Sequence, residues 1–596
     1  MKKLLLVLAI FATLSLSASP IGEQRAREIA ERFFSAGTTR SAVAVEMAWA
    51  GSDLATIGSA TRSGEATENA TLYIYNRADK GGFVVVAGDD NVEKMIVAYS
   101  REEGLDCTNM PDAAKEFLQA WSDQIAEARR APRISATTRY DIRDLGPIEA
   151  LYETARWGQN SPYNGQTPTV DGKHCATGCV ATAMAIFCHY YKWPERCDPQ
   201  HTFPAYTMKN GNNMPAITFG TPYDYDNMLM TYKNGYSEEQ ANAVAQLMWE
   251  CGRAAEINYG VSASGGSTTT AVKELIAYFG YSKGGFQLSK GNTSNEEWYE
   301  MLKENLKAYG PMLCSGYTAS GGGHAFILDG CTSDNYFHWN FGWGGNTNGW
   351  YLLSEMDYHR HIAASFYMEK DVEGTSNYRD MLRLESLWDE SLGNPVNGIY
   401  ASTNNFKNNT TFNVKVAPAE LGYDKTGFNG KLRLAHCDKA NKVKNIVKEI
   451  DCTLGDEEVK IVDFKNVTLT EPIEDGDCLR VLYASDKLKD KNGEMVWSMC
   501  LGRASYGQYG ELFLRLSPEA CAESLSMVYS KTDKNFLFES RHTIQYSITN
   551  SSGKVIQSDE VAPLTEIEVD VSEHPSGTYT FSFATGGEPH KVTIKF

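Results

Sequence analysis

The sequence has no excess of basic residues, and this lack excludes one large class of functions. Its 596 residues include 56 Lys and Arg against 75 Asp and Glu, which gives a formal net charge of −19 at pH 7. Proteins that bind nucleic acid need basic side chains that neutralise phosphates. We therefore expect no nucleic-acid partner.

Beyond its N-terminus, the sequence has no apolar run of the roughly 20 residues that a membrane-spanning helix requires. The N-terminus itself is different, because Lys2 and Lys3 precede the apolar run LLLVLAIFATL and the small residues SLSAS. This order is typical of a secretory signal peptide that is cleaved near residues 17–19. We expect residues 1–19 to be a signal peptide and the protein to be secreted or held at the cell surface.

The cysteines lack the spacing of a metal site. Their number, 13, is odd, so at least one thiol is free or joined to another molecule. In HCATGCVATAMAIFCHYYKWP (174–194), Cys175 and Cys179 are four positions apart, whereas structural zinc sites use CxxC-type pairs. We expect no metal and no cofactor. A disulfide between Cys175 and Cys179 is an alternative that would strain the start of a helix, and the pairing of the other cysteines stays open.

Patterns along the chain divide it into four segments after the signal peptide. Residues 20–135 combine helical and strand patterns and end in the basic, Ser/Thr-rich stretch RRAPRISATTR, which we interpret as an exposed linker. Residues 140–375 show helices first and strands later, which indicates an α+β domain with two lobes and a cleft. Short strands separated by turns then predict two β-sandwich modules, 388–505 and 515–596.

Cys179 is the strongest candidate for a reactive thiol. Gly178 ends a loop of small residues, and VATAMAIFCHYY continues as an apolar helix that the dipeptide WP terminates. Cys179 would therefore lie at the helix N-terminus, where unpaired N–H groups and the helix dipole favour a thiolate. Cys188 and His189, further along the same helix, are better explained by core packing.

Three residues elsewhere could complete a catalytic site with this thiol. His324 lies in GGGHAFILDG, 145 residues after Cys179 (324 − 179), and papain-type Cys–His pairs are about 130–150 residues apart. A hairpin would bring the amide of Asn340 beside the imidazole, shielded by neighbouring aromatic rings, to orient it. Gln159, in WGQNSPYNG, could add a side-chain amide to an oxyanion hole that also uses the N–H of Cys179.

Together these motifs resemble the streptopain-like cysteine peptidases, which have the papain fold. The matching stretches are WGQNSPYN, ATGCVATAMA followed by YYKWP, INYGVSASGG, GGHAFILDG and NFGWGGNTNGWYLL. Upstream, GFVVVAGDD and the helix before it resemble the inhibitory propeptide of that family. The resemblance implies a papain-like, two-lobed peptidase domain that is made as a latent proenzyme, with residues 20–135 as its intramolecular inhibitor.

The resemblance also implies a role for individual residues. Cys179 would be the nucleophile, His324 the general base and acid, and Gln159 the oxyanion donor. Asn340 or Trp343 would hold the histidine, although Phe341 stands where the family usually has Trp. The substrates would be proteins and peptides. The residues implied to line the substrate cleft are Gly323, Ser262, Ser264 and Gly265.

The C-terminal stretch SEHPSGTYTFSFATGGEPHKVTIKF resembles the sorting domain of type-nine secretion, which would make a secretion machinery a partner. An ordinary adhesion or spacer domain is the alternative. For the whole chain, the leading interpretation is a secreted cysteine endopeptidase that is made as a latent proenzyme. The alternatives are a surface binding or adhesion protein with an inactive peptidase-like domain, and a transglutaminase-like acyltransferase. The complete set of catalytic candidates favours the peptidase.

Overall fold

The computed structural model forms two compact units, Met1–Ala271 with Leu306–His359 and Val272–Asn305 with Arg360–Phe596. The predicted signal peptide and nearly all of the predicted linker lie outside the described residues. The described residues are 20–35, 43–57, 69–92, 94–110, 112–129, 145–290, 293, 295–317, 323–353, 362–423, 425–490, 492–502, 510–530, 534–540, 542–561 and 565–596.

The helix that the sequence predicts from Cys179 is present as α3 (Cys179–Tyr191). The helices before the second β-module are α1 (Glu23–Ser35), α2 (Asp112–Ala128), α3 (Cys179–Tyr191), α4 (Glu238–Ala254), α5 (Thr268–Tyr278) and α6 (Asn295–Tyr309). The strands of the first unit are β1 (Val45–Gly51), β2 (Leu72–Arg77), β3 (Phe83–Ala87), β4 (Ile96–Ser100), β5 (Ile148–Leu151), β13 (Met312–Tyr317), β14 (Gly323–Thr332), β15 (Tyr336–Asn340) and β16 (Gly349–Leu352). Short hairpins are made by β6 (Thr169–Val170), β7 (Lys173–His174), β8 (Thr202–Phe203), β9 (Tyr206–Thr207), β10 (Asn213–Met214) and β11 (Ile217–Thr218).

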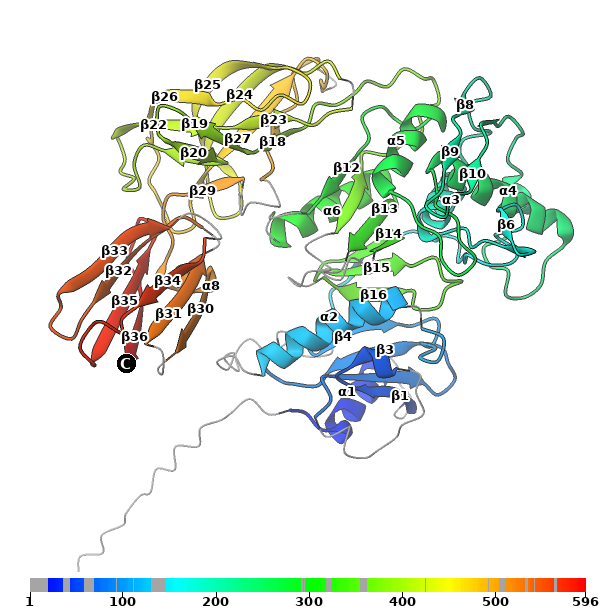
Figure 1. Ribbon diagram of the computed structural model, residues 1–596, viewed down its shortest axis with the longest axis horizontal. Coiled ribbons are helices and arrows are strands. Elements are labelled where there is room, and N and C mark those ends of the chain that lie inside the picture. Colours follow the sequence, from blue (N-terminus) through cyan, green and yellow to red (C-terminus); the bar gives the residue numbers. More distant parts are fainter. Residues whose placement is uncertain are drawn as a thin grey trace, which may run out of the picture. The chain divides into compact units, whose positions relative to one another are not determined.

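One antiparallel sheet runs through the first unit in the order β1-β2-β3-β4-β16-β15-β14-β13, and β5 adds to β14. Figure 1 shows this succession by its labels, from β13 through β16 to β4 and β3. Strands β1–β4 belong to the predicted propeptide, whereas β13–β16 belong to the predicted peptidase. The two groups meet where Tyr99 and Ala98 of β4 pair with Trp350 and Tyr351 of β16. The predicted inhibitor therefore adds its strands to the edge of the peptidase sheet.

Side chains at this edge share one core with the N-terminal helix. Ala26, Ile29 and Phe33 of α1 lie at helical spacing and are buried against β2 and β3. Trp350 and Leu352 of β16 are buried in the same cluster. The hydrophobic effect that folds the N-terminal segment thus also holds it on the peptidase strands.

Among the described residues beyond 360, the second unit is all-β apart from one short helix, α8 (Pro518–Glu523). Its strands up to 513 are β12 (Phe286–Ser289), β17 (Ala363–Phe366), β18 (Leu382–Leu384), β19 (Ser386–Asp389), β20 (Asn394–Asn397), β21 (Ile399–Ala401), β22 (Thr411–Val416), β23 (Pro418–Glu420), β24 (Phe428–Cys437), β25 (Val443–Leu454), β26 (Val462–Thr468), β27 (Cys478–Ser485), β28 (Ser498–Met499) and β29 (Glu511–Phe513). The remaining strands are β30 (Leu525–Ser530), β31 (Asn535–Ser540), β32 (Ile544–Thr549), β33 (Val555–Val561), β34 (Ile567–Asp570), β35 (Thr578–Ala584) and β36 (His590–Lys595).

These strands form two sandwiches, each with a core of its own. In the first, β21-β22-β26 and the sheet built on β25-β24-β27 contribute alternate side chains to one buried cluster. In the second, β30-β31-β34 and β33-β32-β35-β36 do the same. The period-two burial, for example Tyr579, Phe581 and Phe583 of β35, is the pattern expected for strands with one face in a core.

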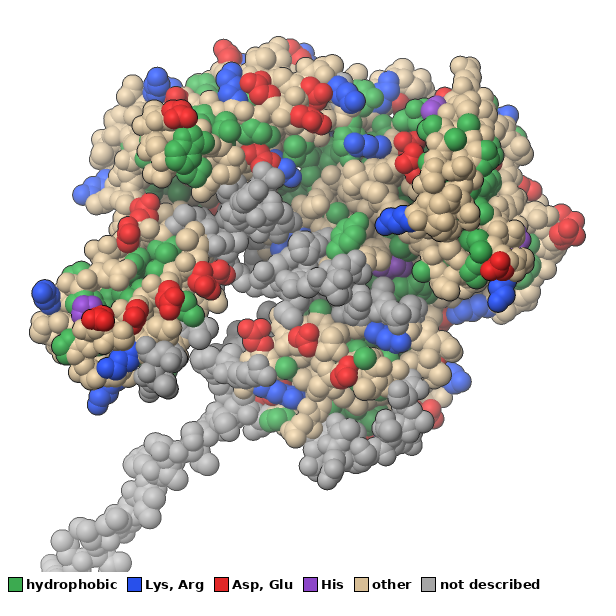
Figure 2. Space-filling model, viewed as in Figure 1, with side chains coloured by type: hydrophobic (Ala, Val, Ile, Leu, Met, Phe, Trp, Pro, Cys, Tyr) green, Lys and Arg blue, Asp and Glu red, His purple; other side chains and the backbone are tan. Residues whose placement is uncertain are grey.

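The visible surface carries both signs of charge. Figure 2 shows acidic and basic side chains interspersed over the face in view. Among the described residues, no helix combines the length and the apolarity that a membrane-spanning segment needs.

A buried arginine connects the first β-module with α6 inside the second unit. The side chain of Arg480 (β27) is 1% exposed and lies 2.6 Å from Glu297 of α6 and 3.5 Å from Glu511 of β29. It also donates to Oδ1 of Asn441 at 2.9 Å. Burial raises the pKa of Glu511 to about 7, although Arg480 opposes that rise. The arginine is therefore the group that compensates two buried carboxyl groups.

We predict that Arg480→Met lowers the free energy of unfolding of this module by about 3–5 kcal/mol, because it leaves buried carboxyl groups without a cation. The measurement is urea-induced unfolding of the full-length chain. Lys431→Met is the matched control, because Lys431 is 39% exposed on the neighbouring strand and pairs with Glu449. It should cost no more than about 1 kcal/mol. Equal effects of the two substitutions would contradict the role given to Arg480.

Candidate active site

Helix α3 begins at Cys179, as the sequence predicts. The residue before it, Gly178, has φ +85°, and a Cβ there would come within 3.0 Å of the Ser264 carbonyl oxygen. Only glycine meets both conditions without strain. The next ten residues of the helix are all buried, which explains why VATAMAIFC carries so few polar groups. The loop and the helix core together fix the position of the Cys179 thiol.

The thiol of Cys179 lies beside the strand that carries His324. The half-buried sulfur contacts the backbone N–H of Ala325, the residue that follows His324 in β14. Helix α3 packs along this strand. Two residues that are 145 positions apart in the chain (324 − 179) are thus brought to one place, as the sequence analysis predicts.

The imidazole of His324 is held by a backbone carbonyl and an indole ring. Its Nε2 lies 2.8 Å from the Phe341 carbonyl oxygen, and its ring stacks on Trp343 with centroids 4.3 Å apart. Because a carbonyl oxygen only accepts, Nε2 carries the hydrogen, and Nδ1 is the acceptor of the neutral ring. The predicted contact between Trp343 and the histidine is present.

The prediction for Asn340 is different from what the structure shows. Its side-chain NH₂ donates to Oγ1 of Thr154 and to the carbonyl of Ala155, both at 2.9 Å, and its Oδ1 accepts from the N–H of Gly342. The amide therefore braces the turn after β15 instead of lying beside the imidazole. The carbonyl of the next residue takes the position that the sequence analysis assigns to the Asn340 amide.

Both catalytic candidates are electrically neutral in this form. Burial raises the pKa of the Cys179 thiol above its usual value, although backbone N–H groups of Ala325 and of the helix start lower it. Burial likewise lowers the pKa of His324 to about 4, against the opposing hydrogen bond to Phe341. The N–H groups of the helix start thus favour a thiolate, as expected, but desolvation is the larger effect in this form and raises the pKa of the thiol.

Gln159 lies next to the loop that precedes Cys179, and its side-chain amide forms no hydrogen bond with a described residue. Its backbone carbonyl accepts from the N–H of Thr177 at 2.9 Å, which ties the two segments together. Among the described residues, its side-chain amide has no hydrogen-bond partner, and the side chain is half-buried. This amide is available as a donor near Cys179.

The residues expected to line the cleft differ in their surroundings. The Ser264 hydroxyl bonds to the N–H of Gly260 at 2.9 Å and to the Ala176 carbonyl at 2.7 Å, so it fixes the loop against the cysteine segment. Ser262 and Gly265 are exposed on the same loop. Gly323 is exposed at the start of β14, where a Cβ would lie 2.8 Å from the Tyr317 ring.

No disulfide joins any of the 13 cysteines, so the alternative of a bond between Cys175 and Cys179 is not realised in the structure. Within the described parts of the chain, no group of three or more His, Cys, Asp or Glu side chains has the arrangement of a metal site.

Comparison with known proteins relates the central region to a family of peptidases. Residues 157–351 match the sequence profile of the Peptidase C10 family. Streptopain of Streptococcus pyogenes serotype M1 is 29% identical over 313 residues, which cover 49% of this chain and 76% of streptopain. The chain thus carries a peptidase C10 domain at its centre. It is a streptopain-like cysteine endopeptidase, and the interpretation as an inactive adhesion scaffold is not favoured.

Other proteins similar to this C10 peptidase share the same region. The thiol protease/hemagglutinin PrtT of Porphyromonas gingivalis is 28% identical over 300 residues, covering 48% of this chain and 34% of that protein. The structure of active interpain A from Prevotella intermedia is 31% identical, with a TM-score of 0.34, and 37% of this chain covers 93% of it. A fragment of prointerpain A is 27% identical, with a TM-score of 0.41, and covers 50% of this chain and 94% of the fragment.

Two further matches flank the C10 domain. Residues 18–125 match the Spi protease inhibitor, and residues 531–596 match a secretion system C-terminal sorting domain. The peptidase is therefore a latent enzyme that carries its inhibitor in the same chain and is exported by type-nine secretion.

Sequence reasoning missed the groups that hold the histidine and the thiol. The carbonyl of Phe341 and the N–H of Ala325 are backbone groups that every residue has, so no pattern of side chains could indicate them. The Thr177 N–H that fixes Gln159 is of the same kind.

The low pKa of His324 predicts a stability change with pH. The unfolded chain binds a proton at the ordinary pKa near 6.5, whereas the folded chain binds it only near pH 4. Stability is therefore lost as the pH falls from about 6.5 to 4, by on the order of 3 kcal/mol. The measurement compares urea unfolding of full-length Cys179→Ala with and without His324→Gln at pH 7 and pH 4. The protein that also carries His324→Gln should lose less stability between pH 7 and pH 4, because it lacks the contribution of His324. Equal losses in the two proteins would contradict the prediction.

Proposed function

We propose that Cys179 and His324 carry out acyl transfer to water on protein and peptide substrates. The observation that supports this assignment is the contact of the Cys179 sulfur with the N–H of Ala325, directly after a histidine held by Phe341 and Trp343. Among the described residues of the family-matched region, no other cysteine starts a helix beside a histidine-bearing strand.

In the proposed reaction, the neutral imidazole takes the thiol proton at Nδ1, and the thiolate attacks the carbonyl carbon of the scissile bond. The C–N bond then breaks, the imidazolium gives its proton to the leaving amine, and an acyl thioester remains. Water, deprotonated by the same imidazole, attacks the thioester and releases the acid and the thiol. Donation from Nε2–H to the Phe341 carbonyl keeps the ring in the tautomer that this cycle needs.

The oxyanion would be stabilised by two donors, the backbone N–H of Cys179 at the helix start and the side-chain amide of Gln159. The cleft would be bounded by Gly323 and by the exposed Ser262 and Gly265 of the 262–267 loop. Ser264 would act by positioning this loop, since its hydroxyl bonds to Gly260 and to Ala176 of the cysteine segment.

Cys179→Ala should abolish hydrolysis of casein by the processed enzyme. Gln159→Ala should lower kcat by about 10²–10³-fold, because the transition state loses one oxyanion donor. Steady-state kinetics and calorimetry of the same preparations separate a lost donor from a lost fold. Gln246→Ala serves as the matched control, since Gln246 bonds to Thr221 and Glu250 of the same unit. Full activity of the Cys179→Ala enzyme would refute the nucleophile.

For latency, we propose that residues 20–135 hold the peptidase inactive until the chain is cut between about 128 and 145, by the enzyme itself. The contacts that support this proposal lie along the shared sheet edge. The Tyr336 hydroxyl donates to the Ile96 carbonyl at 2.7 Å, and Tyr99 stacks on Trp350. In the present form the half-buried thiol and the buried imidazole are both neutral, as expected for an enzyme at rest.

A full-length Cys179→Ala precursor incubated alone should therefore stay uncut, while the wild-type precursor converts to a shorter form. Gel electrophoresis and N-terminal sequencing over time provide the measurement. Addition of processed wild-type enzyme should cut the variant within the same segment. If the purified wild-type precursor is fully active without any cleavage, the proposed latency mechanism fails.

For the remaining chain, we propose that 140–375 is the peptidase domain and that 388–505 and 515–596 are separate β-modules. The last module would be the one that the secretion machinery recognises. Its support is the match of residues 531–596 and a core of its own.

A further inference from the structure

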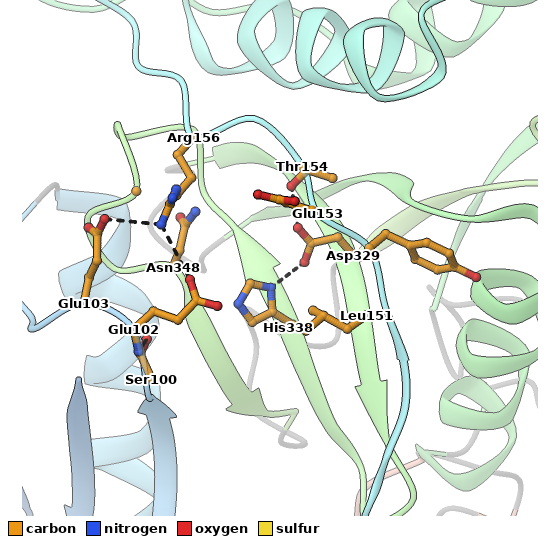
Figure 3. A pocket seen from close by; sticks show the side chains of 12 residues that line it. Ser100, Glu102, Glu103, Leu151, Glu153, Thr154, Arg156, Asp329, His338 and Asn348 are labelled. Carbon is orange, nitrogen blue, oxygen red and sulfur yellow. Dashed lines mark hydrogen bonds and ion pairs between the residues drawn. The ribbon is translucent and has the colours of Figure 1, made fainter. Parts of the chain in front are cut away.

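Two basic side chains of the peptidase are held by glutamates of the inhibitor segment. Oε2 of Glu103 lies 2.7 Å from Nζ of Lys233, and its Oε1 lies 3.4 Å from Nη1 of Arg156. Glu102 adds a third contact, 3.5 Å from the same Arg156 nitrogen. Figure 3 shows Arg156 joined to both glutamates by dashed lines. All three residues line one cavity of about 310 Å³. Every ion pair that the described residues give Arg156 and Lys233 is therefore with the inhibitor segment.

The segments that carry the two cations are held together within the peptidase by hydrogen bonds to backbone carbonyls. The N–H of Arg156 donates to the Met230 carbonyl at 2.8 Å, and the indole N–H of Trp157 donates to the Leu229 carbonyl at 2.7 Å. These bonds join the segment before Gln159 to the segment that carries Lys233, without any contribution from the inhibitor. The cations should remain side by side when the inhibitor leaves.

Arg156 lies on the histidine side of the catalytic pair. The Gly344 N–H donates to the Trp157 carbonyl at 2.8 Å, and a Cβ on Gly345 would lie 3.2 Å from Cδ of Arg156. The residue before Gly344 is Trp343, which stacks on His324. In the proposed reaction His324 protonates the leaving amine, so the part of the substrate after the scissile bond passes this side.

Three further ionisable side chains of the peptidase line the cavity, Glu153, Asp329 and His338, and among the described residues none of them forms an ion pair with Arg156 or Lys233. Asp329 accepts from Thr154 and lies 2.5 Å from Nδ1 of His338, so its charge is already compensated. Removal of the inhibitor takes Glu102 and Glu103 away from Arg156 and Lys233. In a chain with a net charge of −19, the processed enzyme would then expose a local pair of cations beside its cleft.

We propose that Arg156 and Lys233 form a subsite for an acidic side chain on the leaving-group side of the substrate, and that Glu103 occupies this subsite in the latent protein. The inference rests on the catalytic roles proposed above. Exposed ion pairs are individually weak, so the subsite tunes which peptide bonds are cut and does not drive the reaction.

The test uses processed enzyme and quenched fluorescent peptides that differ only by Glu or Gln at the first, second or third position after the scissile bond. At low ionic strength, the wild-type enzyme should cleave one Glu peptide about three- to tenfold more efficiently, by kcat/KM, than its Gln partner. This ratio should approach one in Arg156→Gln/Lys233→Gln and at high salt. It should persist in Lys307→Gln, whose partner Glu149 lies in the peptidase region.

A ratio near one in the wild-type enzyme at all three positions, or a ratio that survives in the double variant, overturns the proposal. Because the ratio is taken within one enzyme, a general loss of activity or stability cancels. Failure of the catalytic assignment would appear elsewhere, as activity that persists in Cys179→Ala, and would leave these ratios measurable.

Discussion

The contact between the start of α3 and the start of β14 is the constraint on which the site depends. It places the Cys179 sulfur against the Ala325 N–H and so beside His324. The same close packing removes water from both groups, which raises the pKa of the thiol and lowers the pKa of the imidazole to about 4. In this form, proximity brings the thiol close to the imidazole, whereas desolvation disfavours the charged form of each group. The pair is assembled, yet neither member is charged.

Latency has a structural basis at β16 of the same sheet, which is separated from β14 by β15 alone. The inhibitor segment joins β16 through main-chain pairing of β4 and through a core that both parts share. Strand addition of this kind depends on backbone hydrogen bonds, so it tolerates change in most side chains. The charged contacts of Glu102 and Glu103 lie just beyond β4, in a turn fixed by bonds between Asn76 and Leu105. The inhibitor thus combines main-chain pairing, which depends little on side-chain identity, with ion pairs that depend on Glu102 and Glu103.

That local contact links inhibition with substrate choice. An inhibitor carried in the same chain needs little affinity for each group it covers, because its effective concentration is high. Exposed ion pairs such as those of Arg156 and Lys233 are sufficient under that condition, although they would be weak between separate molecules. The same cations, once released, face the side of the cleft where the histidine acts.

The sequence by itself determined the secreted α+β peptidase with β-modules, the helix that starts at Cys179, and the contact of Trp343 with His324. These features can be predicted because glycine placement, apolar periodicity and motif order are patterns of residues that are close in the sequence. Only the tertiary structure decided that the Phe341 carbonyl, and not the Asn340 amide, contacts the imidazole, that the thiol is neutral, and that Glu103 meets Arg156. Every residue has the same backbone groups, so the residue types do not indicate which of these groups contacts a side chain. Burial and ion pairs depend on segments that folding brings together from distant parts of the chain.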